Sequence, residues 1–284
     1  MSERPVHVVV VAYEAPEALD DALAPLAGRL PVTVVDNSQS DAVRGVCAGR
    51  GVDYLATPRN LGFGAGANVA LREIAGGAPQ DVLLLNPDAT IAAADVDVLA
   101  RALRAEATIA AVAPRLVDDG AAPVRVLWPF PSPGKAWLEA LGLGRLTGRD
   151  PAFAIGAVLL LRWEALREVG LFDERFFLYA EEADWQQRAL RAGWRTAYCP
   201  DVAAYHRGAG TSTDPTRREV LFHAAQETYV RKWSGTRGWQ AYRAAAVVGA
   251  ATRLLLLRGS RRAYAARRLR LYLRGPRRAA AGLA

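Results

Sequence analysis

Three carboxylates crowd into four residues of the segment Tyr179–Gln186, where Glu181, Glu182 and Asp184 follow an aromatic run. Crowded carboxylates raise one another's proton affinity, so one of the three can be tuned to act as a general base. The same pattern is typical of an acidic helix start, which the helix dipole favours and in which Asp184 would pair with Arg188 four residues later. Both interpretations place the acids in the first turn of a helix.

Polar residues also follow three apolar runs directly, at Tyr13–Glu14, Asp36–Ser38 and Asn86–Asp88. In an open α/β sheet, ligands collect at the carboxyl ends of the strands. There Asp36 can accept a hydrogen bond from a ribose hydroxyl or a base imide, and Asp88 can hold a divalent cation through oxygen. Each aspartate by itself is explained more simply as a helix N-cap. His206, which precedes the glycine-containing loop Arg207–Ser212, could complete a metal site with Asp88 if the fold brings the two together.

A glycine-rich segment, Asn60–Asn68, runs into an expected helix, where backbone amides could meet phosphate or sugar oxygens. Gly62, Gly64 and Ala67 satisfy a loose dinucleotide fingerprint, which supports a nicotinamide-dependent oxidoreductase as an alternative. That fingerprint belongs to the first strand-to-helix turn, however, and here it follows the third expected strand. A tight turn that needs glycine explains the segment about as well.

The elements that must position these residues alternate between β-branched strands and Ala/Leu-rich helices, which predicts an α/β fold. The expected strands are residues 6–12, 32–36, 53–55, 82–85, 153–162 and 195–198. The expected helices are residues 16–30, 40–49, 64–74, 163–169, 181–192 and most of the chain from Pro215 onward. Pro123–Arg149 is rich in Pro and Gly and is expected to be a loop or lid.

The composition, 51% hydrophobic and 23% charged over 284 residues, excludes disordered and collagen-like chains. Cys47 and Cys199 are the only cysteines, so a disulfide framework or zinc ribbon is not expected and a reduced, cytoplasmic compartment is. The apolar run Val8–Ala12 is too short for the core of a signal peptide. The longest later run, Ala244–Leu257, has 14 residues and contains Arg253, whereas a membrane span needs about 18 or more.

Charge is distributed unevenly, because residues 231–284 hold 14 of the 36 Lys and Arg and none of the 29 Asp and Glu. This segment is therefore expected to meet an anionic membrane surface as a peripheral contact. Five aromatic residues in it favour a membrane interface: Trp233, Trp239, Tyr242, Tyr264 and Tyr272. The alternative is a set of helices that pack on the rest of the chain or pair two subunits as a homodimer.

The order of motifs resembles the family 2 glycosyltransferases, and within them the bacterial rhamnosyltransferase-like branch. The resemblance covers residues 6 to about 212. The matching segments are Ala12–Glu14, Val34–Ser38, Asn60–Asn68, Leu85–Asp88, Gly156–Ala157, Gly170–Asp184, and Ala192–Trp194 through His206.

The resemblance implies a GT-A fold over residues 1–214, with a mostly parallel central sheet flanked by helices, and a helical basic C-terminal extension over residues 215–284. It implies an inverting, metal-dependent transfer of a sugar, with a rhamnose-like deoxysugar favoured, from a nucleotide-diphosphate sugar. A dTDP-sugar is favoured over a UDP- or GDP-sugar, and Mg²⁺ or Mn²⁺ is the expected cation. The acceptor would be a glycan, a lipid-linked sugar or a secondary metabolite, and no nucleic-acid partner is expected.

Site residues carried over from the family fall into four groups. The resemblance implies donor contacts for Tyr13, Asp36, Asn60, Gly62, Gly64, Asn68, Asn86 and Asp88. It implies Asp88 and His206 as metal ligands. Glu182 matches the catalytic base, with Glu181 and Asp184 as alternatives, and Gly156, Asp173 and Trp185 match positions near the sugars.

The chain departs from the family pattern at three positions. Asn86 replaces the first Asp of the D-x-D signature, Glu182 stands where Asp is usual, and Glu14 replaces an Asn after Tyr13. The two substituted carboxylate positions, Asn86 and Glu182, motivate a further hypothesis, a catalytically silent module that binds nucleotides or carbohydrates.

Overall fold

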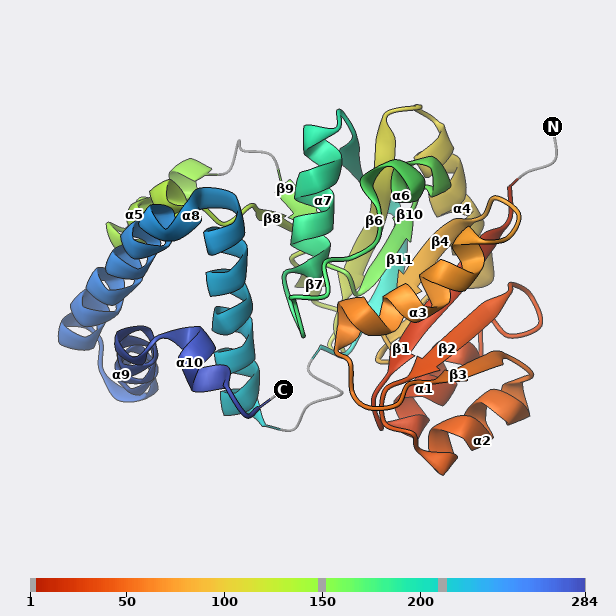
Figure 1. Ribbon diagram of the computed structural model, residues 1–284, viewed down its shortest axis with the longest axis horizontal. Coiled ribbons are helices and arrows are strands. Elements are labelled where there is room, and N and C mark those ends of the chain that lie inside the picture. Colours follow the sequence, from red (N-terminus) through yellow and green to blue (C-terminus); the bar gives the residue numbers. More distant parts are fainter. Residues whose placement is uncertain (1–3, 148–151, 209–213, 284) are drawn as a thin grey trace. The chain divides into compact units, whose positions relative to one another are not determined.

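The computed structural model describes residues 4–147, 152–208 and 214–283 (Figure 1). The chain forms two compact units. The first comprises Met1–Trp128, Ala152–Phe177 and Glu181–Thr213, and the second comprises Pro129–Pro151, Leu178–Ala180 and Asp214–Ala284. Each unit buries apolar side chains of its own.

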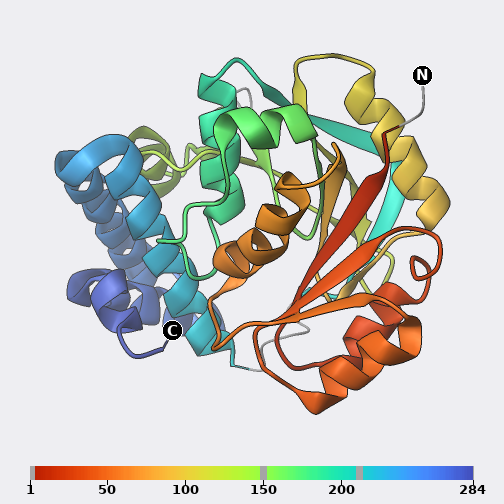
Figure 2. The ribbon, with the colours of Figure 1, turned by 45° about the vertical axis from the view of Figure 1, so that its right-hand side comes forward.

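The first unit is built on a nine-stranded sheet (Figures 1 and 2). The strand order is β3-β2-β1-β4-β10-β6-β11-β5, and β7 pairs with β6. The strands are β1 (Val6–Ala12), β2 (Val32–Asp36), β3 (Asp53–Ala56), β4 (Asp81–Leu85), β5 (Ala89–Thr90), β6 (Ile109–Val117), β7 (Pro123–Val124), β10 (Val158–Leu161) and β11 (Arg195–His206). A short separate pair joins β8 (Leu127–Pro129) to β9 (Ala152–Ala154).

The parallel part of this sheet follows directly from its crossover helices. The strands β3, β2, β1 and β4 are parallel, and helices α1 (Pro16–Leu23), α2 (Asp41–Arg50) and α3 (Phe63–Ala75) connect them. The chain reverses its direction across the sheet between β1 and β4, so a crevice for ligands is expected where these strands end. Beyond β4 the sheet is mixed, because β10 is antiparallel to both β4 and β6 while β6 and β11 are parallel. The predicted α/β class is confirmed.

Several element boundaries differ from the prediction. Helix α1 ends at Leu23 rather than residue 30, and the chain then turns. The expected strand over 153–162 is broken into β9 and β10 around Gly156. Strand β11 extends eight residues past the predicted Tyr198, across an irregularity in its register after Cys199. Pro200 and Asp201 interrupt the apolar pattern at that irregularity, which is why the sequence indicated only the first part of the strand.

The segment predicted as a loop or lid contains regular structure. Within residues 123–147, the structure has β7, β8, helix α5 (Pro133–Ala140) and the 3₁₀ helix η1 (Gly144–Thr147); residues 148 and 149 lie outside the described part. Ser132 caps α5, since its Oγ accepts a hydrogen bond from Lys135 N at 3.3 Å and Pro133 follows at the first helical position. Two further elements, α4 (Ala93–Arg104) and β6, occupy a stretch to which no element was assigned.

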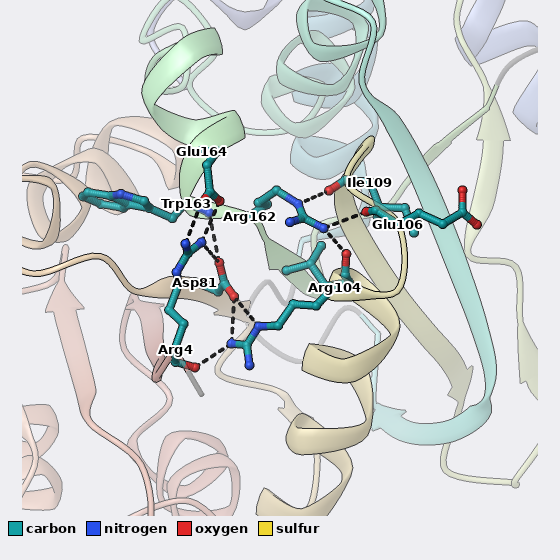
Figure 3. A network of polar contacts seen from close by, with 9 residues as sticks. Arg4, Asp81, Arg104, Glu106, Ile109, Arg162, Trp163 and Glu164 are labelled. Carbon is teal, nitrogen blue, oxygen red and sulfur yellow. Dashed lines mark hydrogen bonds and ion pairs between the residues drawn. The ribbon is translucent and has the colours of Figure 1, made fainter. Parts of the chain in front are cut away.

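The amino-terminal end of β4 is held by a buried ionic network around Asp81 (Figure 3). Arg104 donates to Asp81 Oδ2 at 2.8 Å, and Arg4 Nη1 lies 3.3 Å from Asp81 Oδ1. The backbone N–H of Trp163, at the start of α6 (Trp163–Val169), donates to the same carboxylate at 3.1 Å. Glu164 pairs with Arg4, and this hydrogen bond lowers the pKa of Glu164. The network therefore joins Arg4, α4 and α6 at the amino-terminal ends of the parallel strands. The predicted site lies at their opposite, carboxyl ends.

The second unit is helical. It contains α5, η1, α8 (Pro215–Leu256), α9 (Gly259–Arg274) and α10 (Pro276–Ala280). Gly235, with φ of 68°, divides α8 into two helices across a kink, a conformation that favours glycine. No helix in the described ranges has the length and apolar character needed to span a membrane.

Aromatic side chains form the core of this helical unit. Trp239 stacks on Tyr242 and on Tyr272, and all three are buried. Tyr272 also lies against the ring of His223, whose Nδ1 is 3.0 Å from the Tyr272 hydroxyl. The prediction that Trp239, Tyr242 and Tyr272 favour a membrane interface is therefore wrong, because these residues pack the unit's own helices together.

Burial of His223 makes the stability of the unit dependent on pH. Burial, reinforced by the positive charge of Arg268, lowers the pKa of His223 to about 3. Since this value is below that of an unfolded histidine, the contribution of His223 is fully present above about pH 6.5 and is lost as pH falls toward 3. When the pH is lowered from about 7.5 to about 5, the free energy of unfolding of the wild type should fall by about 2 kcal/mol more than that of His223→Gln, which has no imidazole to protonate. Urea unfolding of both proteins at the two pH values measures the difference, and parallel losses would contradict it.

Candidate active site

The loop after β2 is organised by the buried carboxylate of Asp36. Its Oδ1 accepts hydrogen bonds from Ser38 N at 2.8 Å and Ser38 Oγ at 2.5 Å. Its Oδ2 accepts from Ser40 N and from the Tyr54 hydroxyl, both at 2.9 Å. Four donors of the protein thus already use this carboxylate, so a contact with a nucleobase would have to replace one of them. The predicted donor contact of Asp36 stays a prediction.

Asn37, which the sequence analysis did not single out, ties this loop to the glycine-rich segment. Its Nδ2 donates to Gly62 O at 2.9 Å, and its Oδ1 accepts from Thr57 Oγ1 at 3.0 Å. Asn60 closes a local turn, because its Oδ1 accepts from Gly62 N at 2.9 Å. The segment follows β3, the third strand, so the nicotinamide-binding alternative lacks the structural context that its fingerprint requires.

Gly62 is required by both its backbone conformation and its surroundings. Its φ is 83°, and a Cβ built on it would lie 1.9 Å from the backbone oxygen of Phe177. The next residue, Phe63, donates its N–H to that same oxygen at 2.9 Å. The tight turn therefore holds the start of α3 directly against the segment that precedes α7 (Glu181–Arg191).

Gly62→Ala is expected to destabilise the first unit by more than about 3 kcal/mol, because the added methyl group meets backbone and the residue must keep a positive φ. Gly45→Ala is the matched control, since Gly45 lies inside α2 with no neighbouring atom within 4 Å of an added Cβ. That change should leave stability equal or raise it by about 0.5–1 kcal/mol. Chemical unfolding followed by fluorescence compares the two, and equal midpoints would rule out the close packing at Gly62.

Asn68 and Gly64 join α3 to the segments around α7. The buried amide of Asn68 pairs with the backbone of Phe172, accepting from its N–H at 3.0 Å and donating to its carbonyl at 2.9 Å. A Cβ on Gly64 would lie 3.2 Å from Cβ of Glu181. Asn68 thus has a structural role. A contact between its amide and a nucleotide-sugar donor would require the hydrogen bonds to the Phe172 backbone to break.

Asn86, Asp88 and His206 come together at the carboxyl end of β4. His206 Nε2 lies 3.4 Å from Asp88 Oδ1 and 3.4 Å from Asn86 Nδ2. The pairing of β5 with β11 sets His206 opposite Ala89, next to Asp88 in the chain. Residues 209–212 of the glycine-containing loop expected after His206 lie outside the described residues.

This arrangement fits a divalent cation. Two ligands of an octahedral ion lie roughly 3 Å apart, and the carboxylate oxygen and imidazole nitrogen are 3.4 Å apart. Both side chains are largely buried, at 4% and 14% exposure. Among the described residues, no group of three or more His, Cys, Asp and Glu side chains could hold a metal. A cation held by Asp88 and His206 would therefore need oxygen atoms from a bound substrate to complete its coordination.

The acidic start of α7 adjoins this region through Gly156. A Cβ on Gly156 would lie 3.6 Å from Cβ of Glu182, and the next residue, Ala157, accepts a hydrogen bond from Asn86 N at 2.9 Å. Burial, reinforced by the charge of Glu182, raises the pKa of Glu181 well above its usual value. Of the two carboxylates, Glu181 is therefore the one whose charged form burial disfavours, and the half-buried Glu182 is the better candidate for a base.

Asp184 and Trp185 point into the core of the first unit. Asp184 is fully buried and pairs with Arg188 at 3.0 Å, as the alternative interpretation of the acidic cluster predicted. Arg188 also donates to Val169 O and Leu171 O, so the pair holds the end of α6. Trp185 is fully buried too and donates to Gly170 O at 2.8 Å. Neither side chain lies on an open surface, which gives no support to a base role for Asp184 or a sugar contact for Trp185.

The two remaining predicted residues lie in loops. Tyr13 is half-buried and directly precedes Glu14 and Ala15, which both have φ of 55°. Such strain in residues other than glycine often accompanies a functional site. Asp173 pairs with Arg175 at 2.5 Å in the loop before α7.

A depression of about 520 Å³ lies elsewhere, beside the Asp81 network. It is lined by Arg4, Pro79, Trp163, Glu164, Arg167 and Glu168. Arg4 already pairs with Glu164 and Asp81, and the depression lies at the edge of the sheet opposite to Asp88. The strand ends that carry Asp88 and His206 are therefore a better candidate for the active site than this depression.

Comparison with known proteins gives matches in both sequence and structure. The family described as "Glycosyl transferase family group 2" matches residues 136–265. The N-acetylglucosaminyl-diphospho-decaprenol L-rhamnosyltransferase of Mycobacterium tuberculosis is 31% identical over 264 residues, which cover 82% of this chain and 85% of the relative.

Two solved structures are similar over most of the chain. The mannosyltransferase PcManGT from Pyrobaculum calidifontis, in complex with GDP-Man and Mn²⁺, has a TM-score of 0.58 and 17% identity, over 99% of this chain and 85% of its own. Glucosyl-3-phosphoglycerate synthase from Mycobacterium tuberculosis, in complex with Mn²⁺, UDP and phosphoglyceric acid, has a TM-score of 0.54 and 16% identity, over 82% and 78%. At these identities the likeness concerns the fold.

Proposed function

The chain belongs to the family 2 glycosyltransferases, and we propose that it transfers a sugar with inversion from a nucleotide-diphosphate sugar, in a reaction that depends on a divalent cation. The sequence relative establishes a glycosyltransferase of this family, and the structural neighbours establish the GT-A fold. The nucleotide-sugar donor is supported by the neighbours' own ligands, GDP-Man and UDP. Inversion, the metal and the identities of the substrates are the proposal.

The convergence of Asp88 and His206 carries this proposal. They are far apart in the sequence, yet a carboxylate oxygen and an imidazole nitrogen meet at 3.4 Å at a strand end of an open α/β sheet. Asp88 and His206 would hold the cation, with Asn86 beside them. An imidazole ligand favours a transition ion such as Mn²⁺ over Mg²⁺, which prefers oxygen ligands. When bound, the cation would offset charge that develops on the departing diphosphate.

Glu182 is the proposed base. It would accept the proton of the acceptor hydroxyl as that oxygen attacks the anomeric carbon, a contribution of about 10² to 10⁴ in rate. Gly156 leaves space beside the Glu182 side chain, since a Cβ there would come within 3.6 Å of it. A single displacement with one base inverts the anomeric centre.

The donor and acceptor are proposed from the relatives. One relative is named an L-rhamnosyltransferase that acts on a decaprenol-linked acceptor, which supports a rhamnose-like deoxysugar and a lipid-linked acceptor. We propose dTDP as the carrier nucleotide from the family resemblance alone. A glycan or secondary-metabolite acceptor remains a second choice. Contact of residues 231–284 with an anionic membrane, and with it a position on the cytoplasmic membrane face, belongs to the same proposal.

A thermal-shift screen of nucleotide sugars with and without Mn²⁺ tests the donor, since a ligand that binds only the native protein raises its melting temperature. We expect the largest shift with a dTDP-deoxysugar and Mn²⁺ together. The configuration of the product at the anomeric carbon, measured by NMR, tests inversion. Retention of configuration, or a donor shift that Mn²⁺ does not change, would contradict the corresponding part of the proposal.

A further inference from the structure

The second unit exposes a group of leucines. Leu255 and Leu256, at the end of α8, are 84% and 75% exposed, and Leu141, which follows α5, is 64% exposed. Single exposed leucines are ordinary, but several that gather on one surface mark an interaction site.

These leucines lie at one end of a packed helix pair. Helix α5 runs along the second half of α8, as Figures 1 and 2 both show. A Cβ on Gly249 would lie 3.2 Å from Ala140, and Arg253 donates to Glu139 O at 3.1 Å. Leu256 follows Gly249 by about two helical turns, so it lies on the side of α8 that faces α5, beyond the end of that helix. Leu141 directly follows Ala140 at the same end.

Exposed basic residues follow this group in the chain, and one exposed acidic residue, Glu139, lies at the end of α5 beside Leu141. Arg258, Arg261 and Arg262 follow Leu256 at the turn into α9, and all three are exposed. No acidic residue occurs in the chain after Glu227. We call Leu141, Leu255 and Leu256 the leucine tip, and Arg258, Arg261 and Arg262 its basic rim.

We propose that the leucine tip and its basic rim dock on an anionic lipid bilayer, with the leucines entering the interface and the arginines lying among the headgroups. An apolar centre with a cationic border matches the two parts of such a surface. A second copy of the chain fits less well, because a symmetric pairing of identical patches would set one arginine rim against the other. The inference rests on the proposed function, in which a lipid-linked acceptor gives this docking its use.

The surface differs from the one that the sequence suggested. Three of the five aromatic residues expected at the interface are buried, and the exposed apolar area comes instead from leucines, one of which, Leu141, precedes residue 231. Removal of the chain after Ser234 would therefore be a poor test, since it deletes the buried Trp239, Tyr242 and Tyr272 of the unit's core. Point substitutions on the exposed tip and rim avoid this problem.

Co-sedimentation of the full chain with vesicles tests the proposal, without donor or acceptor. We expect binding to phosphatidylcholine vesicles that contain phosphatidylglycerol, weaker binding as salt screens the charges, and little binding to phosphatidylcholine alone. The double variant Leu255→Ser/Leu256→Ser should bind at least about tenfold more weakly, because both leucines lose their apolar contact. Leu190→Ser, an exposed leucine of α7, is the control and should bind as the wild type does.

A charge-matched pair separates the rim from net charge. Arg258→Glu/Arg261→Glu/Arg262→Glu should abolish vesicle binding, whereas Arg29→Glu/Arg101→Glu/Arg167→Glu, three exposed arginines of the first unit, should retain most of it. The proposal is overturned if the wild type does not bind anionic vesicles at low salt, or if the leucine variant binds them as tightly as the wild type. It is also overturned if the leucine variant turns a dimer into a monomer without a change in vesicle binding.

Hydrolysis of nucleotide sugar, measured in solution, keeps this inference separate from the proposed function. Donor hydrolysis by a wild-type protein that binds no vesicles would reject the docking surface alone. Vesicle binding by a protein that turns over no nucleotide sugar would reject the proposed function and leave the docking surface in place.

Discussion

Glu182→Gln should lower the rate of sugar transfer by about 10² to 10⁴, while the affinity for the nucleotide sugar stays close to that of the wild type. The amide keeps the shape of the side chain but cannot accept the proton of the acceptor hydroxyl. The base acts on the acceptor, so donor binding does not depend on it. Single-turnover transfer and donor titration, measured on the same preparation, separate the two effects.

Glu181→Gln is the informative control, because burial raises the pKa of Glu181 and disfavours its charged form, so a neutral amide is close to the form that the site favours. We expect it to retain most of the transfer rate. Asp184→Asn is a poor control, since it leaves Arg188 without its buried partner and should destabilise the protein. Near-wild-type turnover by Glu182→Gln together with loss in Glu181→Gln would move the base to Glu181.

Much of the fold could be predicted because its signals are local. The uninterrupted apolar runs at β1, β2 and β4 identify strands that are covered on both faces, and their boundaries differ from the prediction by at most one residue. The sequence was less informative where a strand is irregular or a helix is short. Strand β11 contains Pro200 within its length, and α5 begins with the Ser132–Pro133 start signal inside a Pro/Gly-rich stretch.

The candidate site shows a different limit. Residue types paired Asp88 with His206, the family resemblance implied Gly156 and Glu182 as members of the same site, and the structure brings each pair into proximity. Residue types could not show which polar side chains serve the protein itself. Asn68 pairs with Phe172 more than a hundred residues away. A contact of that range depends on how the loops before α7 pack on α3, and no local pattern records it.

Asp36 illustrates the same limit at short range. Its position at the end of β2 is explained more simply by an N-cap than by a ligand contact, and the structure gives its carboxylate four donors from Ser38, Ser40 and Tyr54. The aromatic residues of the second unit show a further limit of prediction from the sequence. Their composition is that of a membrane interface, but burial of Trp239 and Tyr272 can be known only from how α8 and α9 pack.

Asp88→Ala and His206→Ala should each weaken Mn²⁺-dependent binding of the nucleotide sugar, and by similar amounts. The loss should reach at least the roughly 10- to 100-fold that removal of groups orienting a metal ligand produces. Because both residues would act through one cation, the double variant should bind little worse than either single variant. Calorimetric titration of the donor with Mn²⁺ and with a chelator measures these constants.

Asn86→Asp provides the complementary test, since it supplies a second carboxylate beside Asp88 and His206 without a change in side-chain size. A cation held there gains an anionic neighbour, so we expect the Mn²⁺ concentration needed for half-maximal donor binding to fall. A change in the opposite direction, or metal dependence that persists unchanged in both Asp88→Ala and His206→Ala, would place the cation elsewhere. Charge on the departing diphosphate would then have to be offset by other groups of the strand-end loops.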